Sequence, residues 1–139
     1  MRRLLLITFL FTTQPARAET DFAEIGNHWA RCSMELELLA DGMQKRLSPE
    51  ESKNARGKGA RYHIFAVAAA GEEASADVRG KTMRAFMQGI SMEKSAASKY
   101  FADFIADMAG HQQVCEQLLE NHKARFEPTV KEMLAKSKR

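Results

Sequence analysis

The chain is poor both in residues that interrupt helices and in residues that favour strands. Of its 139 residues only three are proline, and one of these, Pro15, lies in the amino-terminal leader described below. Runs of β-branched residues are almost absent, whereas alanine, leucine, methionine, glutamate and lysine recur throughout. Because these recurring residues are favourable in helices, the composition predicts an all-α fold rather than one built from strands.

The chain also lacks the short motifs that accompany common catalytic and cofactor sites. It contains no G-x-S-x-G, no phosphate-binding loop, no H-E-x-x-H and no C-x-x-C-H. Asp103 and Asp107 are four residues apart, but we expect them on a solvated helix face, since no opposing group is identifiable. A hydrolytic role for His63 or His122 has no further support. We therefore predict a non-enzymatic protein.

The first part of the chain has the pattern of a secretory signal peptide. Two arginines follow Met1, an apolar run extends from Leu4 to Phe11, and small residues stand at Ala16 and Ala18. The apolar run is shorter than the roughly 18 residues of a membrane-spanning helix, and no later run is long enough either. We predict a signal peptide over 1–18, cleaved near Ala18, and a single mature domain over 19–139, either periplasmic or secreted.

Removal of the leader changes the charge balance. The whole chain has 21 lysines and arginines against 18 aspartates and glutamates, and three of the arginines belong to the leader. The mature domain therefore has 21 − 3 = 18 basic and 18 acidic residues, a formal charge of zero. A neutral domain gives no support to nucleic-acid binding, which usually shows as a basic surface.

Apolar residues recur at intervals of three and four residues, as expected for amphipathic helices. We predict helices over about 21–46, 49–70, 73–89 and 92–125, and a short C-terminal helix after Pro128. Ser48 and Glu51 fit a capping box at the start of the second helix, Pro49 fits its first position, and we expect the helix to end at Gly71. Gly57 and Gly59 are unfavourable inside a helix, so an alternative to one continuous helix is a break at these residues. The prediction is an antiparallel four-helix bundle.

The two cysteines occur in segments that resemble each other. Cys32 ends "HWARC" and Cys115 ends "HQQVC", and each lies on the apolar stripe of its own predicted helix. An exported chain enters an oxidising compartment, where a disulfide between two helices persists. We predict a Cys32–Cys115 disulfide. It closes a loop of 83 residues and stabilises the fold by about 4 kcal/mol.

The same two segments allow a metal site as an alternative. Residues four apart share a helix face, so His28 with Cys32 and His111 with Cys115 could supply four ligands for zinc or copper. Both thiols would then have to stay reduced. A redox-active pair is disfavoured because the chain has no C-x-x-C.

The segment "KNARGKGAR", residues 53–61, gathers four cations and two glycines before an apolar run. As a flexible basic loop it could dock an acidic partner or an anionic lipid surface through Lys53, Arg56, Lys58 and Arg61. Alternatively it is the solvated first half of a helix.

Taken together, these features favour an exported binding or adaptor protein with an unidentified protein partner, of the inhibitor, immunity or chaperone-like class. The alternative is a periplasmic bundle that binds a metal or small ligand through the paired histidines and cysteines.

Overall fold

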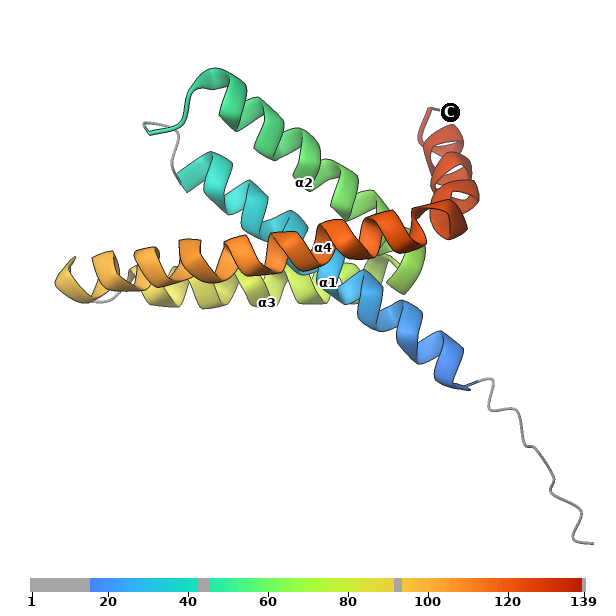
Figure 1. The fold of residues 1–139 in the computed structure, drawn as a ribbon, viewed down its shortest axis with the longest axis horizontal. Helices are drawn as coiled ribbons and strands as arrows, with labels where there is room; N and C mark the ends of the chain where they lie inside the picture. The colour runs from blue at the N-terminus through green and yellow to red at the C-terminus, as the bar shows by residue number, and fades with distance from the viewer. Residues whose placement is uncertain (1–15, 43–45, 92–93, 139) are drawn as a thin grey trace, which may run out of the picture.

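The computed structural model of the chain describes residues 16–42, 46–91 and 94–138. Within these ranges it contains no strand and four helices: α1 (Ala16–Gly42), α2 (Pro49–Ala70), α3 (Glu72–Ile90) and α4 (Lys94–Lys136). Consecutive helices run in opposite directions (Figure 1). The prediction of an all-α antiparallel bundle is therefore confirmed. Residues 1–15 of the predicted signal peptide lie outside the described residues.

The four helices form two hairpins that cross each other. One hairpin consists of α1 and α2, which make the most extensive contact in the fold, and the other consists of α3 and α4 (Figure 1). Helix α1 contacts all three other helices. Side chains far apart in the sequence therefore meet where α1 crosses α4.

Local signals fix both ends of α2. The Ser48 hydroxyl accepts a hydrogen bond from the Glu51 backbone N–H at 3.2 Å, and the Glu51 carboxylate accepts one from the Ser48 N–H at 2.7 Å. At the other end Gly71 has φ = 91°, a backbone conformation that residues other than glycine rarely adopt. Its N–H donates a hydrogen bond to the Val67 carbonyl. The predicted capping box and the predicted bounds of this helix are confirmed.

Two glycines allow α1 and α2 to pack closely. A Cβ at Gly59 would lie 3.2 Å from the Ser33 carbonyl oxygen, and a Cβ at Gly26 would lie 2.5 Å from the Ala70 Cβ. The helix is not broken at Gly57 or Gly59. Close backbone packing at Gly59 outweighs the low helix propensity of glycine.

The predicted short C-terminal helix is the last part of α4 and not a separate element. Helix α4 continues through Pro128 to Lys136, and its final turns, drawn in red, point in a different direction from the rest (Figure 1). Proline removes one helical hydrogen bond, which bends a helix without necessarily ending it. Phe126 and Val130, on either side of Pro128, are both buried and keep the bent segment on the core.

The buried residues form two clusters. The main core centres on Trp29, whose ring makes edge contacts with Phe65 and Phe126, each at a centroid distance of 5.6 Å. Its other members come from α1, α2 and α4: Ile25, Ala30, Cys32, Leu36, Tyr62, Ala66, Cys115, Leu119 and Val130. The distal cluster is smaller and consists of Met34, Leu38 and Phe86, with Tyr100, Phe101 and Phe104 packed against it.

Candidate functional site

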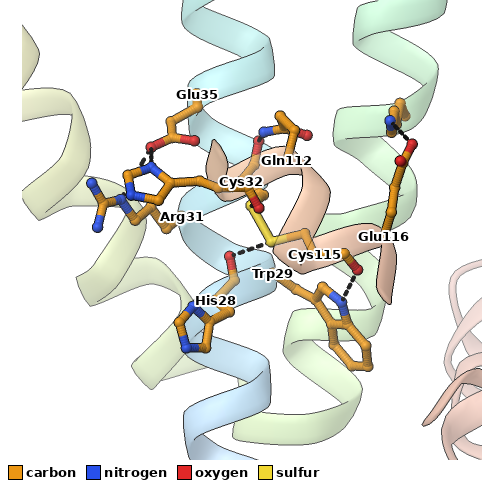
Figure 2. The surroundings of a disulfide bond; sticks show 10 residues. His28, Trp29, Arg31, Cys32, Glu35, Gln112, Cys115 and Glu116 are labelled. Carbon is orange, nitrogen blue, oxygen red and sulfur yellow. Dashed lines mark hydrogen bonds and ion pairs between the residues drawn. A yellow bond between two sulfur atoms is a disulfide. The ribbon is translucent and has the colours of Figure 1, made fainter. Parts of the chain in front are cut away.

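The two cysteines form a disulfide at the crossing of α1 and α4 (Figure 2). The sulfurs of Cys32 and Cys115 are 2.10 Å apart and the Cα atoms 6.7 Å apart. Both residues are buried, at 1% and 0% exposure. The predicted disulfide is confirmed, and it joins α1 covalently to α4.

The repeated histidine–cysteine spacing reflects how the two helix backbones approach each other. The Cys32 sulfur lies 3.3 Å from the carbonyl oxygen of His111, and the Cys115 sulfur lies 3.2 Å from that of His28. Each sulfur thus contacts the backbone one turn before the opposite cysteine. Two hydrogen bonds reinforce the crossing: Trp29 Nε1 donates to the Cys115 carbonyl at 3.2 Å, and Gln112 Nε2 donates to the Cys32 carbonyl at 3.1 Å.

The backbones of the four predicted metal ligands lie close together, but their side chains do not converge on one point. The ring of His28 is exposed and points away from the disulfide (Figure 2), whereas His111 Nδ1 lies 2.8 Å from Glu35 Oε1. Both sulfurs are bonded to each other, and a zinc or copper cage needs them as thiolates. In the described residues no group of three or more histidine, cysteine, aspartate or glutamate side chains could hold a metal ion. The metal hypothesis therefore requires the reduced protein.

Glu35 is a buried acid that the sequence reasoning missed. It is only 2% exposed, and its Oε1 accepts a hydrogen bond from Arg31 Nε at 3.0 Å in addition to its contact with His111. Its Oε2 is buried and has no hydrogen-bond partner among the described residues. A buried carboxylate is costly unless it is paired. The available signal was its position: Glu35 follows Cys32 by three residues and so lies on the buried side of α1.

A cavity of about 380 Å³ lies beside Glu35, between α1, α3 and α4. We call it the Glu35 pocket. Its walls combine aromatic rings, three carboxylates and two cations: Phe86, Tyr100, Phe104, Glu35, Asp103, Asp107, Arg31 and Lys81, with Val78, Thr82 and Ala85 completing them. Asp103 and Asp107 are exposed, as expected, and they line the same cavity as Glu35.

The two cations of the pocket lining, Arg31 and Lys81, are each paired with an acid of α1 or α3. Arg31 bonds Glu35, and Lys81 Nζ lies 2.6 Å from the carboxylate of Asp77, outside the pocket. Asp103 and Asp107 are exposed and make no hydrogen bond or ion pair with any described residue. Two carboxylates without a partner among the described residues therefore line the same cavity as the buried one.

A second feature is an apolar stripe left uncovered on α3. Met83, Met87 and Ile90 are 46%, 53% and 41% exposed, whereas Phe86 is only 6% exposed. Neighbouring helix residues are about 100° apart, so Phe86 can face the core while Met87 does not. We call Met83, Met87 and Ile90 the α3 outer stripe. The predicted helix is present, but of Met83, Phe86, Met87 and Ile90 only Phe86 is buried.

The basic segment at 53–61 is not a loop; it is the first half of a helix, which was the alternative interpretation. It lies in α2, where Arg56 pairs with Asp41 at 2.7 Å and Lys58 forms an ion pair with Glu116. The capping box starts the helix before this segment, and Gly59 packs against α1 within it. Lys53 and Arg61 are exposed on the same helix. Whether the segment docks a partner stays a prediction.

His63 lines a separate cavity of about 300 Å³ together with Ser33, Glu37 and Arg79. Burial and the nearby Arg79 guanidinium lower the pKa of His63 from its ordinary value of 6.5. Its Nδ1 is buried without a partner among the described residues, and no hydrogen bond joins its ring to Ser33 or Glu37 there. The geometry of an activated serine is thus not formed in the described part of the chain.

Comparison with known proteins finds no match: no protein-family model, no curated protein and no solved structure is similar to the chain. None of the described helices is both long and apolar enough to cross a membrane.

Proposed function

We propose that the protein is exported and acts as a non-enzymatic binding module, docking an amphipathic helix of a partner protein on the α3 outer stripe. The observation that carries this proposal is the exposure of Met83, Met87 and Ile90, each more than two-fifths accessible to solvent. Inhibitor, immunity and chaperone-like proteins all belong to this functional class.

The spacing of the stripe suits a helical partner. Met83, Met87 and Ile90 follow one another at intervals of four and three residues, which is the seam on which a second helix packs. Methionine is flexible and polarisable, so it adapts to different apolar partners. Large apolar side chains grouped on one exposed face commonly mark interaction sites. A helix with apolar residues at the same intervals would complete this seam.

Two features support export. The leader has the charge and hydrophobic pattern of a signal peptide, and the buried Cys32–Cys115 disulfide suits an oxidising compartment. The basic segment is not part of the proposed surface, because Arg56 and Lys58 are already engaged by acids within the chain.

The proposal is tested by charge substitution on the stripe. Chemical crosslinking in the exported fraction should join the wild-type protein to a discrete partner protein. We expect this crosslinked partner to be absent for Met83→Glu/Met87→Glu. A helix seam does not tolerate two carboxylates at its centre. The matched control is Val114→Glu/Leu134→Glu, two residues of α4 that are 42% and 46% exposed, and this variant should retain the partner.

Two outcomes would contradict the proposal. Equal capture of the same proteins by both double variants would show that the stripe is not the interface. A wild-type dimer in light scattering that becomes monomeric only in Met83→Glu/Met87→Glu would assign the stripe to a second copy of the chain. Cell fractionation with sequencing of the mature amino terminus tests export separately.

A further inference from the structure

We infer that the Glu35 pocket is a second binding site, which takes an alkylammonium group independently of the α3 outer stripe. Such a group pairs a positively charged nitrogen with an apolar carbon chain. The pocket offers carboxylates for the nitrogen and aromatic rings for the carbons.

The acidic side of the site is an observed arrangement of three carboxylates around one cavity. Glu35 is 2% exposed, lines the cavity, and has one carboxylate oxygen without a partner among the described residues. Asp103 and Asp107 line the same cavity and are likewise unpaired in the described part of the chain. An ammonium group brings three N–H donors for the exposed carboxylates of Asp103 and Asp107, and its positive charge offsets the negative charge of the three acids.

The aromatic part of the lining favours an organic cation over a metal ion. Phe86, Tyr100 and Phe104 border the cavity, and aromatic faces attract alkylammonium groups through the ring quadrupole. The described residues hold no cluster of acids and histidines fit to chelate a metal ion. A volume of about 380 Å³ lies at the small end of ligand cavities, which suits a single short chain.

The surrounding structure holds Glu35 in place before any ligand arrives. His111, one turn before Cys115, and Arg31, one turn before Glu35, both contact Oε1, while Oε2 is buried and has no hydrogen-bond partner among the described residues. The disulfide fixes α4 against α1 at this level, so the carboxylates on both helices keep their relative positions. A preorganised acceptor lowers the cost of binding.

The test is a titration of full-length oxidised protein followed by NMR chemical shifts. n-Butylamine should shift signals of the pocket residues, whereas n-butanol, which has the same chain length and no charge, should bind at least roughly tenfold more weakly. Asp103→Asn/Asp107→Asn should weaken butylamine binding by a similar factor, and both positions are exposed, so this variant is expected to fold. Glu24→Gln/Glu127→Gln removes two exposed acids outside the pocket and should bind as wild type does.

The ammonium group could belong to a free amine or to a lysine side chain of a partner, and two further probes distinguish these sources. Binding of spermidine without binding of a blocked Gly-Lys-Gly peptide would assign the site to free amines. Binding of the peptide would assign it to lysine side chains. The inference is overturned if butanol binds as tightly as butylamine, if Asp103→Asn/Asp107→Asn leaves the affinity unchanged, or if no probe shifts the pocket signals.

Discussion

The disulfide crossing joins α1 and α4, and the distal cluster joins the same two helices to α3, yet the two regions differ in how completely their side chains are buried. At the crossing Trp29, Cys32 and Cys115 are at most 1% exposed, and a covalent bond and two side-chain-to-backbone hydrogen bonds span the helices. In the distal cluster Phe86 is buried, while the next residue, Met87, is 53% exposed.

The distal cluster relies on aromatic contacts and has no covalent link. Phe86 meets Phe101 and Phe104 at centroid distances of 6.2 and 4.9 Å, and the Tyr100 hydroxyl donates to the Ala85 carbonyl at 3.0 Å. Both the Glu35 pocket and the α3 outer stripe border this cluster through α3. Closure of the disulfide crossing allows the region around the distal cluster to leave apolar side chains exposed and acidic groups without partners among the described residues.

The largest expected effect is loss of the disulfide. Reduction should lower the free energy of unfolding by about 4 kcal/mol, because the unfolded chain is no longer constrained by an 83-residue loop. The measurement is urea denaturation with and without a phosphine reductant. Cys32→Ala/Cys115→Ala should show the lower stability under both conditions and no response to the reductant.

A thiol count on protein from the exported fraction tests the same bond in its native setting. We expect no free thiols and no stoichiometric metal. Two free thiols together with about one equivalent of zinc or copper would contradict the disulfide and restore the site formed by His28, Cys32, His111 and Cys115.

The features that could be predicted from the sequence are those with local causes. The ends of α2 follow from Ser48, Glu51 and Gly71, which act through hydrogen bonds and backbone conformation within a few residues. The disulfide was predictable because both cysteines lie on apolar stripes of long helices and the chain offers no other pairing.

The features that escaped prediction depend on how the two hairpins cross. Periodicity treats Phe86 and Met87 alike, and only the crossing decides which of them is covered. Glu35 resembles the exposed acids around it until α4 brings His111 to its carboxylate. The Glu35 pocket needs three helices at once, so no single segment contains its pattern.

The second effect compares a close contact between α1 and α2, at Gly26, with a close contact in the distal cluster, at Gly89. Gly26→Ala should cost about 1–3 kcal/mol, because its Cβ would press on both the Cβ and the backbone nitrogen of Ala70. Gly89→Ala should cost less, about 1 kcal/mol, because its Cβ meets the ring of Tyr100, which can turn toward solvent at the loss of one hydrogen bond. Thermal or urea denaturation measures both.

Gly57 provides the control for helix propensity. A Cβ at this position meets nothing within 4 Å, so Gly57→Ala should stabilise the protein by up to about 1 kcal/mol. Equal costs for Gly26→Ala and Gly89→Ala would show that the distal region is packed as rigidly as the α1–α2 contact.

The smallest effect is the pH dependence of stability contributed by His63. This residue of α2 lies outside both regions and shares a cavity with Arg79 of α3. Burial and Arg79 lower the pKa of His63 below 6.5, while Glu37 and Glu72 act in the opposite direction. The unfolded chain therefore binds a proton more readily than the folded one, and stability should fall as the pH decreases through about 6.5. His63→Gln should remove this component without changing the response to reductant. The measurement is the urea midpoint of wild type and of His63→Gln from about pH 8 to about pH 5.5. The same pH dependence of the midpoint in both proteins would contradict the contribution of His63.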